Sequence, residues 1–307
     1  LQAKREAELQ AKREAELQAK REAELQAKRE AELQAKREAE LQAKRSIREE
    51  QQPARELQQS ERIARPQSLW GSLQEFTVNA AHLGRNRIIT AEREDPAHAA
   101  FDVLRTRLLQ ALADNGWKRV AITSPTKDCG KTFTAANLAI SLSRQENCRT
   151  LLLDCDMRRP SLHRVLGVEK PGAMGEMLRG NIPPEQHLMR LGKNAIHAGR
   201  NIAFGLNSVI EPYASELLQD PRTAESLSKL EEELNPDVML FDLPPALYYD
   251  DVIAFRPMFD GVLLVVGGGT TTEKEIKEVE RRLGDSTPLL GMVLNKAEHT
   301  ETSRYQY

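Results

Sequence analysis

The feature that most constrains the fold of this chain is a glycine-containing loop between an apolar strand and an apolar helix. Val120–Thr123 has the pattern of a buried strand, Ser124–Thr132 reads SPTKDCGKT, and a helical pattern follows to Arg144. A loop ending in GKT at the start of a helix is typical of a phosphate-binding loop. Pro125 stands where the GxxxxGK[ST] pattern has its first glycine. The arrangement predicts nucleotide binding.

Each residue at the end of this loop has a chemical reason to be there. Gly130 allows the backbone to pass close to a phosphate, and neighbouring amides can then point inward. Lys131 is expected to reach the β- and γ-phosphates, and the Thr132 hydroxyl to hold Mg²⁺. The N-terminus of the following helix adds partial positive charge.

Short apolar segments alternate with helical patterns after residue 87. A helix is expected at Phe101–Ala113, and further strands at Thr150–Asp154, Asp237–Asp242, Gly261–Val266 and Leu289–Leu294. This alternation predicts an α/β fold, with a parallel sheet of the P-loop NTPase type flanked by helices. Ligands in such folds bind beyond the carboxyl ends of the strands.

Two further motifs place carboxylates at strand ends. Leu151–Arg158 reads LLLDCDMR, so Asp154 and Asp156 would meet at the same mouth of the sheet. A strand-terminal aspartate that caps the next helix explains one of these residues but not both. Asp242 ends the apolar strand of VMLFDLPP, which is the expected form of a carboxylate that holds Mg²⁺ through water.

A phosphate loop, then LLLDxDxR, then an apolar strand ending in DxxP resembles the bacterial tyrosine kinases, ATPases of capsular and exopolysaccharide assembly. The resemblance covers about residues 87–297 and includes EPYASELL (211–218) and GMVLN (291–295). It implies ATP and Mg²⁺ as cofactors and protein-tyrosine phosphorylation as the activity. The residue roles that it implies are Lys131 and Asp154 for catalysis, Gly130, Lys131, Thr132 and Asn295 for nucleotide binding, and Thr132, Asp156 and Asp242 for the metal.

The resemblance also implies partners. A membrane polysaccharide co-polymerase would recruit the chain from the cytoplasm to the inner face of the plasma membrane, and the chain would form homo-oligomers. The family's self-association motif, ExxRxxR, falls here on Ala99, Asp102 and Arg105, so one position of three is kept. Tyr305 and Tyr307 in the tail are predicted autophosphorylation sites, and incidental tail tyrosines are the alternative.

Four regions follow one another along the chain. Residues 1–52 begin with five copies of LQAKREAE and are predicted to form a charged helical spacer, because an eight-residue period gives no straight leucine seam. A loose self-associating coil is the alternative. Residues 53–86 have the composition of a linker, residues 87–299 form the ATPase or kinase domain, and residues 300–307 form a flexible tail.

Composition limits the other functions. Lys and Arg total 44 against 46 Asp and Glu, which does not favour a nucleic-acid-binding protein. Three scattered cysteines favour neither disulfides nor a zinc site. No apolar run approaches the roughly 20 residues of a membrane span. Two rival functions remain: a positioning ATPase of the chromosome-partitioning type, whose additional lysine is absent at Thr126, and a nucleotide-gated scaffold with little catalysis.

Overall fold

The computed structural model describes residues 69–88, 96–194, 196 and 198–297. The helix predicted over residues 1–52 and the tail tyrosines Tyr305 and Tyr307 lie outside these residues. The described residues belong to one compact unit.

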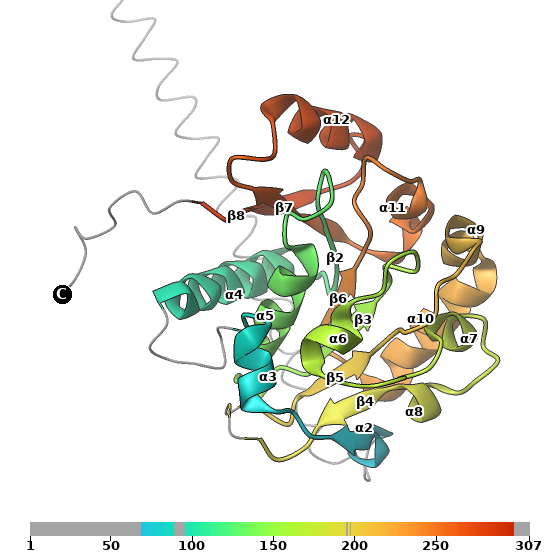
Figure 1. Ribbon diagram of the computed structural model, residues 1–307. Coiled ribbons are helices and arrows are strands. Elements are labelled where there is room, and N and C mark those ends of the chain that lie inside the picture. The colour runs from blue at the N-terminus through green and yellow to red at the C-terminus, as the bar shows by residue number, and fades with distance from the viewer. Residues whose placement is uncertain (1–68, 89–95, 195, 197, 298–307) are drawn as a thin grey trace, which may run out of the picture. The chain divides into compact units, whose positions relative to one another are not determined.

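The centre of the described unit is a sheet of eight strands in the order β1-β4-β5-β3-β6-β2-β7-β8 (Figure 1). All neighbouring strands run parallel except β4 and β5, which are antiparallel. The strands are β1 (Gln74–Phe76), β2 (Arg119–Thr123), β3 (Thr150–Asp154), β4 (Met189–Leu191), β5 (Ile202–Gly205), β6 (Val238–Asp242), β7 (Gly261–Gly267) and β8 (Leu289–Asn295).

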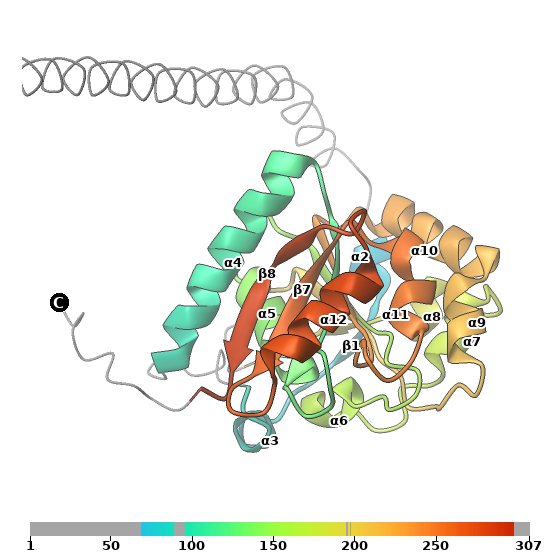
Figure 2. The same ribbon diagram turned by 90° about the horizontal axis from the view of Figure 1, so that it is seen from above.

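The central strands are apolar throughout because both faces of the sheet are covered. Along β3, Leu151 and Leu153 point into one core and Leu152 into the other, as the two-residue period of a strand requires. The first core includes side chains of α2 (Leu69–Ser72), α7 (Met174–Leu178), α9 (Ala214–Gln219), α10 (Pro221–Leu234), α11 (Asp251–Ala254) and α12 (Glu273–Leu283). The second includes those of α3 (Ala80–Arg85), α4 (Pro96–Asn115), α5 (Lys131–Ser143) and α6 (Leu162–Leu166). Figure 2 shows α4 and α12 on opposite sides of β7 and β8.

Two short elements complete the description. Helix α8 (Pro184–His187) leads into β4, and the 3₁₀ turn η2 (Arg256–Met258) leads toward β7. No helix within the described ranges is both long enough and apolar enough to cross a membrane.

The predicted α/β class and the central strands are confirmed, and the edge of the sheet departs from the prediction. Residues 69–86 were expected to be linker, but α2 and β1 are built from them. Trp70, Leu73 and Phe76 are buried in the two cores, and the Trp70 indole donates a hydrogen bond to the Arg200 carbonyl at 3.1 Å. This part of the predicted linker therefore belongs to the folded unit.

Candidate active site

The site begins with two aspartates held side by side by the register of the sheet. Asp154 ends β3 and Asp242 ends β6, and the two residues are direct partners in the parallel ladder. Both side chains are fully buried. The adjacent strand β2 leads into the phosphate loop, so the loop and the carboxylates meet at the same edge of the sheet.

The phosphate loop is fixed by its backbone geometry. Gly130 has φ 92°, and a Cβ added there would overlap the side-chain amide of Asn295. The backbone conformation thus favours glycine, and a larger residue would also displace the Asn295 amide. The Pro125 carbonyl accepts a hydrogen bond from Leu247 N at 3.2 Å, and the Ser124 carbonyl accepts one from Ala246 N at 2.8 Å. Although proline stands in place of the first glycine, the loop is hydrogen-bonded to the segment that follows β6.

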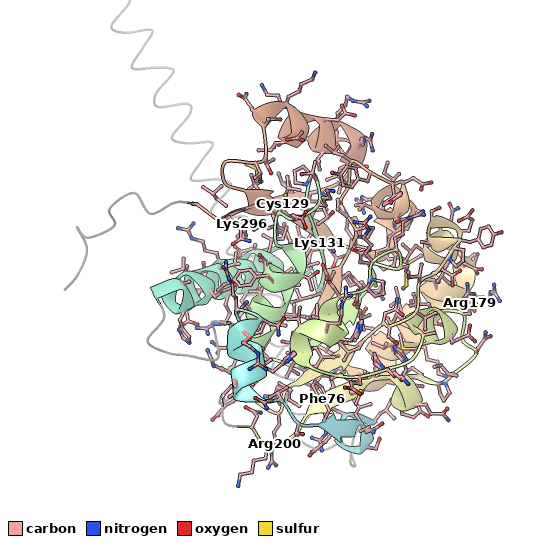
Figure 3. All side chains as sticks on the ribbon, in the orientation of Figure 1. Phe76, Cys129, Lys131, Arg179, Arg200 and Lys296 are labelled. Carbon is pink, nitrogen blue, oxygen red and sulfur yellow. The ribbon has the colours of Figure 1, made fainter. Side chains whose placement is uncertain are left out.

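Lys131 forms the ionic centre of the site. Its Nζ lies 2.7 Å from Asp156 Oδ2 and 3.4 Å from Asp242 Oδ1. Burial alone would lower the pKa of Lys131, but the carboxylates of Asp242 and Asp156 outweigh it and raise this pKa. The side chain is thus a permanent cation at the mouth of the sheet (Figure 3).

Thr132 begins a chain of hydroxyl and carboxylate oxygens. Its Oγ1 donates to Asp242 Oδ2 at 2.6 Å, and Ser161 Oγ donates to Thr132 Oγ1 at 3.2 Å. Burial raises the pKa of Asp242, while Lys131 and the Thr132 hydroxyl oppose that shift. Ser161, which precedes α6, was not singled out from the sequence because a lone serine carries no motif.

Asp154 combines the two roles weighed from the sequence. Its Oδ2 accepts from Leu162 N at 3.1 Å, at the start of α6, and its Oδ1 accepts from Asp156 N at 3.3 Å. Burial, followed by the charge of Asp242, raises the pKa of Asp154 well above its usual value. The residue is a helix-end acceptor and also a buried carboxylate beside Lys131, so capping does not exclude a chemical role.

Asn295, predicted to bind the nucleotide, contacts the phosphate loop directly. Its Nδ2 donates to the Cys129 carbonyl at 2.8 Å, which ties the end of β8 to the residue before Gly130. Lys296 follows and is labelled near Cys129 in Figure 3. The Cys129 thiol is buried and contacts Thr126 and Thr271. In this structure Asn295 braces the loop.

An ion pair beside the site was not foreseen. Arg158, the last residue of DxDxR, donates from Nε and Nη2 to the two carboxylate oxygens of Asp251 at 2.7 and 2.9 Å. The ring of Tyr249 stacks under the guanidinium, 4.2 Å from it. Asp251 is buried, and both of its carboxylate oxygens are used in this ion pair. The two partners are 93 residues apart in sequence, and no local pattern could have paired them.

The oxygen groups at the site fit a hydrated magnesium ion. Mg²⁺ keeps several waters and takes one or two carboxylates together with nucleotide phosphates. The Thr132 hydroxyl and the carboxylates of Asp156 and Asp242 supply such oxygens around one point. Across the described ranges, no three His, Cys, Asp or Glu side chains form a metal cage of their own. The donor set therefore suits an ion that arrives with a nucleotide.

Comparison with known proteins agrees with this geometry. The profile of the CobQ/CobB/MinD/ParA nucleotide binding domain matches residues 120–307. The "Putative tyrosine-protein kinase EpsB" of Ralstonia solanacearum is 32% identical over 229 residues, which are 73% of this chain and 29% of that protein. The "Succinoglycan biosynthesis transport protein ExoP" of Rhizobium meliloti is 30% identical over 203 residues, which are 64% of this chain and 24% of that protein. The chain thus spans less than a third of either relative.

A solved structure gives the same result. "The kinase domain of Escherichia coli tyrosine kinase ETK" matches with a TM-score of 0.61 and 26% identity, covering 72% of this chain and 84% of that one. The resemblance to bacterial tyrosine kinases that the motifs indicated is confirmed, and so is the P-loop type of fold.

Proposed function

Because this chain belongs to the CobQ/CobB/MinD/ParA nucleotide-binding domain family, we propose that it transfers the γ-phosphoryl group of ATP to protein tyrosines, including its own. The observation that carries the proposal is the register of Asp154 with Asp242 directly beside Lys131. A phosphate-binding cation and two buried carboxylates then meet at one point. Phosphoryl transfer needs little more than such positioning and charge stabilisation.

The residues have separate tasks in this mechanism. Amides of the loop before Gly130 and the ammonium of Lys131 bind the phosphates and stabilise the charge that develops on the transferred group. The Thr132 hydroxyl, Asp156 and Asp242 would hold Mg²⁺, which supplies electrostatic stabilisation when it is bound. Asp154 accepts the proton of the attacking tyrosine hydroxyl. Its location between the metal-binding groups and the start of α6 supports this role.

The biological setting is proposed from the relatives. ExoP is named for succinoglycan biosynthesis and transport. We therefore place this chain in the control of exopolysaccharide synthesis, with a membrane polysaccharide co-polymerase as the partner that recruits it to the inner face of the plasma membrane. Self-association is part of the same proposal. Arg105, the position kept from the ExxRxxR motif, binds Asp102 and Ser141 of its own chain. Self-association must therefore also use contacts elsewhere on the surface.

The test is incubation of the full chain with labelled ATP and Mg²⁺, followed by detection of phosphotyrosine. Lys131→Ala should lower the rate about 10²–10³-fold, the usual cost of removing one preorganised charge. It also leaves Asp156 and Asp242 without their cation, so loss of stability alone could lower the rate.

Lys131→Arg is the matched variant. It keeps the charge, and hence cooperative melting, but a guanidinium does not reproduce the compact ammonium at the phosphates. We expect it to melt like the parent chain and to phosphorylate poorly. Full activity in Lys131→Ala would contradict the proposal, and ATP hydrolysis without any phosphotyrosine would favour the positioning ATPase or the scaffold.

A further inference from the structure

A polar cavity that no step above uses lies between α3 and α6. It has a volume of about 610 Å³ and is walled by side chains from three separate parts of the chain. We call it the α3–α6 cleft. Its charged and imidazole-bearing residues are His82, Arg85, His163, Arg164, Glu169 and Lys170. Thr77, Asn79 and Ser208 add hydroxyl and amide groups. The lining therefore offers many hydrogen-bond donors and a single carboxylate.

The carboxylates of the described residues do not neutralise the cations of the cleft. Elsewhere in the domain, arginines are paired with carboxylates, as in Arg158 with Asp251 and Arg179 with Glu211. Within the described part of the chain, neither Arg85 nor Lys170 forms an ion pair, and the hydrogen bond of Arg164 goes to the Pro160 carbonyl at 3.3 Å. Three cations facing one acid leave an excess of positive charge in a concave site, which attracts anions.

The walls of the cleft are fixed to one another. His82 Nε2 lies 2.8 Å from the Arg164 carbonyl, and because a carbonyl can only accept, the imidazole donates this hydrogen bond. Gly167 has φ 75°, and a Cβ there would come within 3.1 Å of the His82 ring. Ser208 Oγ donates to the Gly172 carbonyl at 3.1 Å. The cleft is thus a formed feature of the fold, and residues 77–85 make one of its walls.

The cleft is one short helix away from the candidate active site. Helix α6 has five residues, so it is about 7.5 Å long. Its first residue, Leu162, donates to Asp154, whereas Arg164 at its middle and Gly167 directly after its last residue line the cleft. In an extended peptide, residues two apart are separated by about 7 Å. Tyr305 and Tyr307 have this spacing.

We propose that the α3–α6 cleft binds the phosphate of a phosphotyrosine, presented by the tail of a second copy of this chain. A phosphate monoester carries nearly two negative charges and three acceptor oxygens, which matches two arginines, a lysine and neighbouring hydroxyl donors. The peptide would place one modified tyrosine in the cleft while the other lies near Asp154. This inference rests on the proposed function, since that function supplies the phosphotyrosine.

Binding can be measured without catalysis. Fluorescent peptides of residues 298–307, either unmodified or carrying phosphate on Tyr307, are titrated with the full chain in the presence of ADP and Mg²⁺, which fill the phosphate loop. Fluorescence anisotropy should report at least about tenfold tighter binding of the phosphorylated peptide, since charge-assisted hydrogen bonds are gained. Equal affinity of the two peptides would overturn the proposal.

Variants identify the site of binding. The double variant Arg164→Gln, Lys170→Gln should weaken binding of the phosphorylated peptide about tenfold or more. Glu169→Gln removes the repelling carboxylate and should tighten it, an effect that damage to the fold cannot imitate. The double variant Lys274→Gln, Lys277→Gln on α12, at the other edge of the sheet, changes the net charge as much as the double variant of the cleft and should have no effect. Insensitivity to the cleft variants would rule out this site.

Two further measurements are needed. One distinguishes a tail phosphotyrosine from free phosphate, and the other distinguishes this inference from the proposed function. Inorganic phosphate should compete only weakly, because it lacks the peptide; competition at the peptide's own concentration would overturn the assignment to a tail. Phosphotyrosine formation from ATP is measured in parallel. Its absence, with the cleft binding intact, refutes only the proposed function. Its presence, without cleft binding, refutes only this inference.

Discussion

At the scale of single residues, the site keeps two carboxylates where folding alone would not favour them. Asp154 and Asp242 are fully buried neighbours, and burial raises the pKa of each. Lys131 compensates part of this charge. Groups whose ionised form is disfavoured in the folded state reduce stability at neutral pH, and such a cost is common at catalytic sites.

Asp154→Asn should therefore raise the melting temperature while it abolishes phosphotyrosine formation. The folded-state pKa of Asp154 is raised, so its contribution is most favourable below the unfolded carboxyl pKa and is lost as pH rises through the folded pKa. For a domain of this size, each kcal/mol recovered adds about 2–4 °C.

The measurement is thermal melting of both chains in metal-free buffer from pH 7.5 to pH 4. The gain in melting temperature should shrink toward pH 4, because Asp154 of the parent chain is then protonated and, like the asparagine, carries no charge. A variant that is less stable than the parent at pH 7.5 would show that the hydrogen bonds to Leu162 and Asp156 outweigh the buried charge.

At the scale of elements, the N-terminal pieces are part of the packing. Strand β1 pairs with β4 in a parallel register, and Phe76 packs edge-to-face on Phe204 of β5 at 5.7 Å. Leu83 of α3 is fully buried in the same core. These contacts complete the edge of the sheet that lies farthest from β8.

Two truncations test this edge. A chain lacking residues 1–60 should bind ATP about as well as the full chain, since it keeps α2, β1 and α3. A chain lacking residues 1–86 should be strongly destabilised, because losing one large buried aromatic such as Phe76 already costs about 3–5 kcal/mol. Urea unfolding of both chains measures the difference. Similar unfolding midpoints would mean that the segment 69–86 contributes little to the fold.

The elements that the sequence predicts are those with continuous apolar runs. Strands β2, β3, β6, β7 and β8 are such runs, and their boundaries agree with the prediction within about a residue. Strands β1, β4 and β5 are only three or four residues long, which is too short for a recognisable hydrophobic pattern. Their formation depends on pairing with residues distant in sequence.

The candidate site likewise contains features that the sequence predicts and features that it does not. The phosphate loop and the two aspartate motifs are local patterns, and the structure brings them together as expected. The pairing of Arg158 with Asp251, the brace from Asn295 to Cys129 and the α3–α6 cleft each join residues far apart in the chain. Such contacts depend on the assembled topology, and a single sequence carries no periodic signal for them.

At the scale of the whole molecule, the tail tyrosines are predicted to be modified between copies. The last described residue, Ala297, follows β8, and Tyr305 is eight residues further along. A segment that starts so close to the site has few conformations that return its tyrosines to that site, whereas a neighbouring site requires only an encounter. Phosphorylation should therefore accelerate with protein concentration.

A mixing experiment decides this point. The Asp154→Asn chain supplies intact tails, and a chain ending at residue 299 supplies active sites. Mass spectrometry of the mixture should find phosphate on Tyr305 and Tyr307 of the Asp154→Asn chain. When either chain is incubated alone with ATP, no phosphate should be found on these tyrosines. Phosphorylation of the full chain at a rate independent of concentration would indicate modification within one molecule.

The order of the sheet also determines how the molecule can be tethered. The chain enters the described unit at α2, beside the β1 edge, and leaves it after β8 at the opposite edge. Seven spacings of about 4.8 Å separate these edges, roughly 34 Å before twist shortens the path. A molecule that is attached to a surface through its first residues is therefore held at the β1 edge of the sheet, and its β8 edge is left unrestrained. The chain leaves the described unit at the edge that such an attachment does not hold.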